Sequence, residues 1–505
     1  MKKIILLVIT LSCGTFVQAQ DFIDNALLFS RVRPGGSART QALGGAQVAL
    51  GGDYSSALSN PAGLGMFNRS EFTFSTSLNM ISAEANFFDT NTNDSKANFN
   101  VPGLSLVFHH ESGKEVGFLG GSFAVSLSRI NDLHQNYQYT GRNGDNSILD
   151  YFIADAGDID PDELLATNSY VGSYYYSLTG LAYNNYLIED RQDANGYFYD
   201  SQLNFTSATQ TEISKRKGAQ YQWSIAYGAN FSDKFFVGAN IGITTLRYKL
   251  SQVYQENELD YPDQNFQPAR NFTIEEAYDI RGSGVNLGLG VTCRPLNFIQ
   301  LGMSFVSPTY YQIADNYSAR IDSQWNIYDV NDPSFPNQEF VFEEFDQPLV
   351  SDYSLTTPMR LTTGAAFISK LGFITADVEF VNYTKSKYGS KIAADFNNEN
   401  SLIRVEYQPV VNYRIGAEYR YNIFRARAGY SFMADPFRRS DEVSRDIQIF
   451  SGGLGMRTKD YYIDLASMVS NTEGRRVPYT VSGPDPVANL KLSTLSFLVT
   501  VGFIF

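Results

Sequence analysis

The segment KLSTLSFLVTVGFIF, residues 491–505, alternates between apolar and small or polar side chains. From Leu495 onward every odd position is apolar, and Ser496, Thr500 and Gly502 lie between these positions. A repeat of two residues indicates a β-strand whose two faces meet different surroundings. With its final Phe505, the segment is typical of the last strand of an outer-membrane barrel, which has one face for lipid and one for the lumen.

The same alternation recurs along the chain, but a soluble β-sandwich would show it too. The number of strands and the lengths of their connections therefore decide between the two folds. The sequence predicts fourteen strands, at residues 72–81, 102–109, 116–130, 219–231, 235–250, 281–294, 298–312, 355–369, 372–386, 405–420, 422–433, 445–458, 460–470 and 491–505.

Short and long connections alternate between these strands. The short ones include residues 232–234 and 295–297. The long ones are residues 82–101, 131–218, 251–280, 313–354, 387–404, 434–444 and 471–490. Short periplasmic turns and long outer loops are typical of transmembrane barrels, and an even strand number returns both ends to the periplasmic side. We therefore expect an all-β, 14-stranded antiparallel transmembrane barrel.

The composition argues against two other classes of protein. The most apolar run, residues 4–11, is far shorter than the roughly 20 residues that a helix needs to cross a bilayer. A net charge of −14 and only 3 His residues argue against a nucleic-acid partner, which would require a basic face.

Residues 1–19 are predicted to be a cleaved signal peptide. Residues 2–3 are both Lys, residues 4–11 form the apolar core, and residues 17–19 form a cleavage site that ends in a small residue. A lipoprotein signal at Cys13 is disfavoured because Thr10 stands where Leu is expected. Cleavage after Ala19 would leave Cys293 as the sole cysteine, so we expect no disulfide.

Residues 20–70 precede the first predicted strand and are rich in glycine and other small residues. A barrel of this strand number encloses a lumen too wide for its own side chains to fill, so water or a plug must occupy it. A disordered periplasmic tail is the alternative, but Ala, Leu and Val are too frequent here for a solvated tail. We expect residues 20–70 to form a plug inside a barrel made of residues 71–505.

Within this segment, residues 55–64 read SSALSNPAGL. They resemble the hatch motif of the FadL/TodX family of outer-membrane transporters, with Asn60, Pro61 and Ala62 at the hatch position. Further segments that resemble the family are residues 301–310, 358–367, 376–380, 413–419 and 427–430. The resemblance implies passive uptake of hydrophobic small molecules, such as long-chain fatty acids or aromatic hydrocarbons, across the outer membrane of a Gram-negative bacterium. It implies no enzymatic activity, no cofactor and no metal.

In that family a kink in the third strand opens a side exit into the membrane lipid. The third predicted strand here contains Gly120 and Gly121, and glycine inside a strand weakens pairing. We take this pair as the candidate kink. The alternative is that the two glycines make room for the plug, and Gly452-Gly453 is a competing pair.

The longest predicted loop contains a helix start at Asp160-Pro161, followed by apolar and aromatic residues. A hydrophobic ligand gains roughly 0.8 kcal/mol for each methylene that leaves water, so an apolar groove here would capture it. The alternative is that this face packs on neighbouring loops. The candidate capture residues are Leu164, Leu165, Tyr174, Tyr175 and Leu178.

A group of charged residues points into the lumen on the ninth to eleventh predicted strands. Charges that face a lumen pair with each other, with a plug or with a substrate head group. The preferred partners are the plug residues Arg31, Arg33 and Arg39. The cluster comprises Asp377, Glu379, Arg414, Glu418, Arg425 and Arg427.

Two other functions remain as alternatives. The first is a shuttle that holds secreted proteins, as the FadL-type barrel PorV does in type IX secretion. The second is a membrane-embedded hydrolase, which is disfavoured because no Ser or Asp can be assigned to the outer-loop His134.

Overall fold

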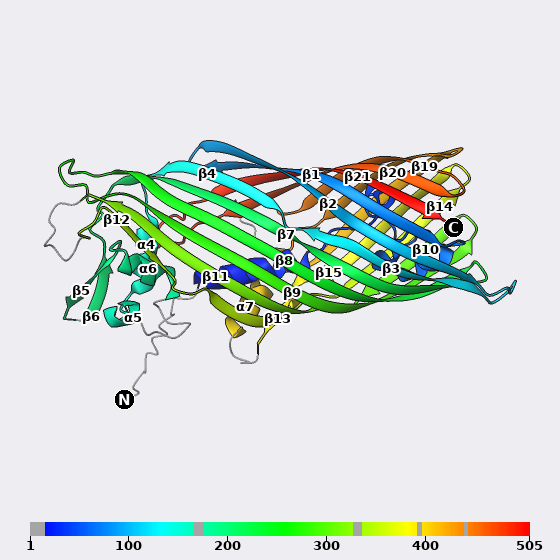
Figure 1. Cartoon of the computed structure of the whole chain (residues 1–505), viewed down its shortest axis with the longest axis horizontal. Helices are drawn as coiled ribbons and strands as arrows, with labels where there is room; N and C mark the ends of the chain where they lie inside the picture. The colour runs from blue at the N-terminus through cyan, green and yellow to red at the C-terminus, as the bar shows by residue number, and fades with distance from the viewer. Residues whose placement is uncertain (1–15, 166–175, 195, 327–335, 391–395, 439–442) are drawn as a thin grey trace, which may run out of the picture.

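The computed structural model describes residues 16–165, 176–194, 196–326, 336–390, 396–438 and 443–505. Its main feature is a closed antiparallel barrel of fourteen strands, as the sequence predicts (Figure 1). β1 (Glu71–Phe87) pairs with β21 (Ala488–Ile504) from Glu71↔Ile504 to Asn86↔Asn489, and this ladder closes the barrel. No helix among the described residues is long and apolar enough to span a bilayer.

Some barrel strands are continuous and others consist of two pieces. Besides β1 and β21, the continuous strands are β2 (Thr90–Glu111), β7 (Ser207–Phe231), β8 (Phe235–Asp260), β9 (Ala269–Leu296), β17 (Pro409–Tyr421), β18 (Phe424–Met433), β19 (Ile447–Arg457) and β20 (Tyr461–Arg476). The two-piece strands are β3 (Phe118–Asp132) with β4 (Gln135–Asn143), β10 (Ile299–Val306) with β11 (Tyr310–Trp325), β13 (Leu349–Thr356) with β14 (Arg360–Ser369), and β15 (Gly372–Asn382) with β16 (Lys387–Gly389). Pro308 and Pro358 lie at two of the breaks, because proline cannot donate to a ladder.

The two faces of the wall differ as the alternation predicts. On the outer face of β9, Val285, Leu287 and Leu289 are 55%, 57% and 56% exposed, which a soluble protein would avoid over a continuous band. On the inner face, polar side chains such as Ser122 and Gln222 are buried. The barrel is therefore apolar outside and polar inside.

Three of the predicted long connections, residues 82–101, 251–280 and 313–354, are largely strand in the structure. Residues 82–101 form the far halves of β1 and β2, which turn at Phe88 and Asp89 with φ angles of 43° and 60°. Most of residues 251–280 continue β8 and β9 in the same way. The outward positions of these extensions are mostly polar, so the apolar outer face that marks the membrane part stops before the strands do, whereas inward side chains such as Phe87, Phe272 and Ile274 are buried in hydrophobic clusters.

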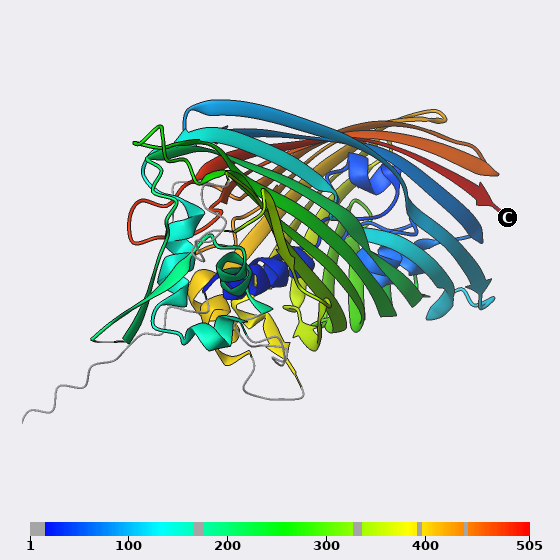
Figure 2. The ribbon, with the colours of Figure 1, turned by 60° about the vertical axis from the view of Figure 1, so that its left-hand side comes forward.

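The plug lies inside the barrel, where Figure 2 shows it in dark blue. Its elements are α1 (Phe16–Ser30), α2 (Ala38–Ala42), α3 (Ser56–Ser59) and the 3-10 helix η1 (Pro61–Met66). The backbone N–H of Ala38 donates to Thr500 Oγ1 at 2.8 Å. The N–H groups of Gln47 and Val48 donate to Asp377 Oδ2 at 2.7 and 2.9 Å. Polar groups of the wall thus satisfy backbone groups that the short plug helices leave without partners.

A small helical subdomain covers the barrel end opposite the short turns (Figure 1). It contains α4 (Ile148–Ala156), α5 (Pro161–Leu165), α6 (Leu178–Asn184) and the hairpin of β5 (Glu189–Asp193) and β6 (Gly196–Asp200). Phe152, Leu181 and Trp325 belong to its hydrophobic core. Further elements are β12 (Phe340–Glu344), η3 (Tyr383–Lys385) and α7 (Asn397–Glu406).

Candidate functional site

The barrel wall lacks backbone pairing along one line between β2 and the strand formed by β3 and β4. The β2–β3 ladder runs from Glu111↔Gly120 to Gly103↔Ser128 and ends there. Beyond this point β2 pairs with β1, and β4 pairs with β7. No ladder joins β2 to β4 in the described chain. We call this line the seam; its residues are Asn98, Asn100, Arg129, Asp132 and His134.

Local sequence explains why pairing stops at the seam. Pro102 has no N–H to donate, and the β1–β2 ladder slips its register between Ser75 and Ser77 opposite it. On the other side, β3 slips between Arg129 and Asn131 against β7. Gly218 of β7 has a φ of 146°, and a Cβ there would lie 2.0 Å from the carbonyl oxygen of Arg247. Each neighbouring strand thus bends where the ladder ends.

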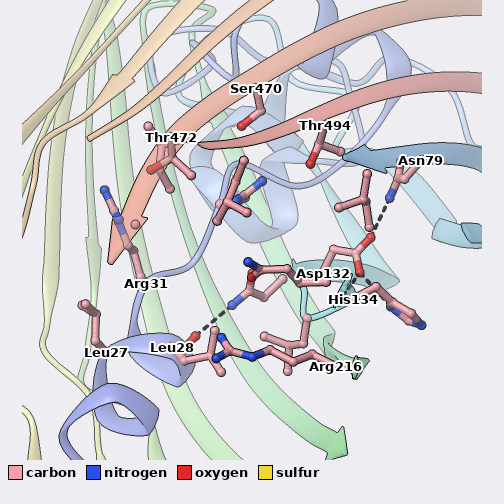
Figure 3. Close-up of a pocket in the computed structure, with 18 of the residues that line it drawn as sticks. Leu27, Leu28, Arg31, Asn79, Asp132, His134, Arg216, Ser470, Thr472 and Thr494 are labelled. Atoms are coloured by element: carbon pink, nitrogen blue, oxygen red, sulfur yellow. Dashed lines mark hydrogen bonds and ion pairs between the residues drawn. The ribbon is translucent and has the colours of Figure 1, made fainter. Parts of the chain in front are cut away.

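Asp132 holds the two sides of the seam together. Its Oδ1 accepts from Arg129 Nη2 at 2.7 Å and lies 2.9 Å from His134 Nδ1. Its Oδ2 accepts from Asn79 Nδ2 of β1 at 2.6 Å and from Asn98 Nδ2 of β2 at 3.4 Å (Figure 3). Side-chain hydrogen bonds therefore replace the missing ladder, and such bonds can open without unfolding a strand.

A lumen cavity of about 470 Å³ lies behind the seam. Figure 3 shows Leu27 and Leu28 of α1 on one side of it, opposite Ser470 of β20 and Thr494 of β21, with Arg31, which follows α1, beside Thr472 of β20. A groove of about 900 Å³ lies on the outer face of the wall. Asn100, Arg129 and His134 line both spaces, so the cavity and the groove meet at the seam.

The cavity lining combines apolar side chains with arginines. Its apolar members include Leu27, Leu28, Ile130, Ile447, Ile449, Met468, Leu490 and Leu498. Arg31, Arg33, Arg129 and Arg216 also line it. Arg129 is 8% exposed, and its Nε and Nη1 have no hydrogen-bond partner among the described residues. Such a cavity can hold an apolar molecule and can also satisfy a polar end on it.

The plug is bonded to the wall next to the seam. The carbonyl of Leu28 accepts from Asn131 Nδ2 at 3.0 Å, and the carbonyl of Phe29 accepts from Gln220 Nε2 at 3.0 Å. These carbonyls belong to the last turn of α1, which has no intrahelical donors for them. Asn131 directly precedes Asp132, so a displacement of α1 would also displace the side chains of the seam.

The glycine pair proposed as a kink is paired on both sides. Gly120 and Gly121 lie opposite Glu111 and His110 in the β2 ladder, and both are also paired with β7. The β7 ladder nevertheless slips its register between Phe118 and Gly120, and Gly120 has a φ of 153°, so the strand is locally irregular beside the pair. A Cβ on Gly121 would lie 2.4 Å from the Tyr227 hydroxyl oxygen, which explains the need for glycine. Of the competing pair, Gly453 makes room for the plug, since its Cβ would lie 2.6 Å from Ala42 Cβ.

The hatch motif connects the plug to the wall. Asn60 is fully buried, and its Oδ1 accepts from the N–H of Ala62 at 3.2 Å, which caps η1. Its Nδ2 donates to the carbonyl of Val48 at 2.6 Å and to Thr292 Oγ1 at 3.1 Å. Pro61 packs so closely on β8 that a Cβ on Gly238 would lie 2.3 Å from its carbonyl carbon.

Five of the six predicted lumen charges belong to a largely buried network of ion pairs and hydrogen bonds. Arg427 donates to Glu418 at 2.7 Å and to Asp464 at 2.5 Å. Arg414 donates to Glu379 at 2.7 Å. The attraction within a buried ion pair offsets much of its desolvation cost, so removing one partner leaves an uncompensated charge and is strongly destabilising.

The plug joins this network, and Arg425 does not. Asp377 accepts two plug N–H groups, and Arg39 of the plug lies 3.8 Å from Glu418. Arg31, by contrast, donates to the carbonyls of Met433 and Ala434. Arg425 donates to the carbonyls of Asn422 and Phe424 at a short turn.

The predicted capture residues are divided between core and surface. Leu164 is fully buried and Leu178 packs against the core of the helical subdomain, whereas Leu165 is 46% exposed. Tyr174 and Tyr175 lie outside the described residues. The predicted helix start is present, since α5 begins at Pro161.

The expectation that no Asp can be assigned to His134 is wrong, because Asp132 Oδ1 lies 2.9 Å from His134 Nδ1. The ring Nδ1 of His134 lies near Asp132, Asn98 and Arg129, and none of these is a serine. The interruption of alternation at Pro102-Gly103 was the available signal for the seam.

Comparisons with known proteins find likeness in structure but not in sequence. No protein-family model matches the chain, and no curated protein matches it. A FadL homologue from Pseudomonas aeruginosa superposes with a TM-score of 0.54 over 94% of this chain and 99% of its own, at 11% identity. The toluene transporter TodX from Pseudomonas putida superposes with a TM-score of 0.52 over 94% and 99%, at 14% identity. The expected likeness to the FadL/TodX family is confirmed for the fold.

Proposed function

We propose that this barrel stands in the outer membrane of a Gram-negative bacterium and takes up hydrophobic small molecules without an energy source. One observation carries the proposal: Asn100, Arg129 and His134 line both the lumen cavity and the groove on the outer wall. A molecule in the cavity is therefore separated from the outer groove by these side chains.

The physical reason for a sideways exit is the low solubility of the cargo. A ligand that left through the plug would enter the periplasm and lose roughly 0.8 kcal/mol for every methylene returned to water. A ligand that passes through the seam moves from an apolar cavity into lipid. Arg129 of the seam pairs with Tyr221, about 11 residues from the short turn at the end of β7, so the seam lies at the outer edge of the hydrocarbon core and its unpaired backbone borders the cavity.

We place the exit at the seam and keep Gly120-Gly121 as the competing position. Both strands beside the glycine pair would have to give up ladder hydrogen bonds before the wall opened there. At the seam, the bonds that must break are the side-chain hydrogen bonds around Asp132 and the one from Thr92 Oγ1 on β2 to the Gln138 carbonyl on β4. The seam opening is the less costly of the two.

The plug and the helical subdomain can both be given a place on this ligand route. We propose that residues 1–19 are removed, that residues 20–70 close the periplasmic side and that the barrel extends from residue 71 to 505. Cleavage after Ala19 would leave most of α1 in the lumen, with Leu27 and Leu28 on the cavity. Leu165, Tyr174, Tyr175 and Leu178 remain candidates for first capture outside.

The test is mass spectrometry of small molecules extracted from the purified full-length protein. We expect a co-purified fatty acid or other hydrophobic molecule, whose amount falls at least several-fold in Ile449→Gln, which places an amide in the cavity. The matched control is Leu371→Gln, at a short turn where Leu371 is 64% exposed, and it should retain the ligand. A co-purified secreted protein without any hydrophobic molecule would instead support the shuttle function.

A further inference from the structure

Outward-facing basic residues collect on three neighbouring strands. Lys215 and Lys217 lie on β7, Arg247 and Lys249 on β8, and Arg281 on β9, and all five side chains are exposed. The ladders place Lys217 opposite Lys249 and Arg247 opposite Arg281. We call these five residues the basic patch.

The basic patch lies just above the apolar band of the barrel. A tilted strand crosses the hydrocarbon core in about 9–11 residues. Counted from the short turns, residues 231–221, 235–245 and 296–286 cover that span on β7, β8 and β9. Trp223, Ile243 and Leu287 within these spans are exposed to the outside. The basic patch follows on each strand at the level of the lipid head groups.

The positive charge of the basic patch is only partly neutralised within the chain. Asp279 pairs with Lys249 and with Arg281, both at 2.9 Å. Lys215, Lys217 and Arg247 form no ion pair among the described residues. This concentration of positive charge stands out in a chain whose net charge is −14.

The outer groove continues from the basic patch toward the seam. Arg247 and Arg281 line it together with Phe99, Tyr221, Leu246 and Ala314. Its lining therefore offers cations at the head-group level and apolar side chains beside them. A lipid with an anionic head group has the complementary arrangement, with its negative charge at that level and its acyl chains next to it.

We propose that the basic patch binds phosphate groups of outer-leaflet lipids, whose acyl chains lie on the apolar band below and in the outer groove. The inference rests on the proposed function only for the outer-membrane location, and not for the ligand route. Each Lys or Arg near an anionic lipid surface contributes about 1 kcal/mol, so the three unpaired cations would dominate binding.

The experiment measures binding of lipid A, with and without its phosphates, to the purified full-length protein in detergent by native mass spectrometry. We expect the combined variant Lys215→Gln, Lys217→Gln and Arg247→Gln to bind phosphorylated lipid A about a hundredfold more weakly. The matched control replaces Lys114, Lys370 and Lys459 at the short turns by Gln, which removes the same charge at the other end. It should bind like the unchanged protein.

The outcomes separate the possible sources of the anion. Equal binding of dephosphorylated lipid A, or unchanged binding by the patch variant, would overturn the proposal. Displacement of lipid A by an equimolar amount of inorganic phosphate would also overturn it, because the site would then recognise a free ion. A protein that binds lipid A but retains no hydrophobic molecule would contradict the proposed uptake and leave the basic patch intact.

Discussion

Ligand uptake should fall to background when the seam is bridged by a short, reducible bis-thiosulfonate cross-linker between Asn98→Cys and His134→Cys, in a Cys293→Ser background. The two native side chains approach to 3.3 Å across the seam, so a bridge there fixes β2 to the start of β4. Because no ladder has to break at the seam, the proposed opening depends on side-chain contacts there, and this bridge prevents it. Uptake of a labelled long-chain fatty acid by cells, before and after reduction, measures the effect.

The control bridge lies across the intact part of the same strand pair. Phe108→Cys and Phe123→Cys occupy opposed, outward positions in the β2–β3 ladder. Backbone hydrogen bonds already hold this part of the wall closed, so the control bridge should leave uptake unchanged. Normal uptake through a fully bridged seam would exclude the sideways route at that position.

Removal of residues 22–60 should raise the single-channel conductance in planar bilayers many-fold. A barrel of fourteen strands encloses a lumen wide enough for an aqueous channel, and the plug is what fills its short-turn end. The wall itself closes through β1 and β21 without the plug, so the barrel should still assemble.

A second variant with a smaller change tests the plug function even if the deletion variant does not insert into the membrane. Asp377→Ala keeps the whole plug but removes the acceptor for the N–H groups of Gln47 and Val48. We expect brief conductance steps from transient displacement of the plug. An inserted deletion variant with the conductance of the unchanged protein would contradict the plug function.

The barrel and the plug could be predicted because each depends on local pattern. Every predicted strand overlaps a strand of the structure, since lipid and lumen impose alternation on residues such as 495–505. Strand ends could not be predicted in the same way. Residues 90–96 read TNTNDSK, and a strand that meets water on both faces carries no apolar alternation.

The seam could not be read from the sequence because it depends on which strands do not pair. Pro102-Gly103 marks a weak point in β2, but only the register shows that β4 pairs with β7 alone and leaves one edge of β2 without a ladder. The sequence predicts the kink at Gly120-Gly121 because a glycine inside a strand marks either a bend or a close contact. Here both occur, because β3 slips its register against β7 between Phe118 and Gly120, while Gly121 faces a close contact with Tyr227.

Photo-cross-linking of a diazirine-labelled long-chain fatty acid, followed by peptide mapping, tests the route through the wall most directly. The cavity and the groove share Asn100, Arg129 and His134, so we predict adducts at these residues on β2, β3 and the start of β4. Adducts confined to Met66 and Phe67 at the short-turn end of the plug, with none at the seam, would contradict sideways exit and indicate passage into the periplasm.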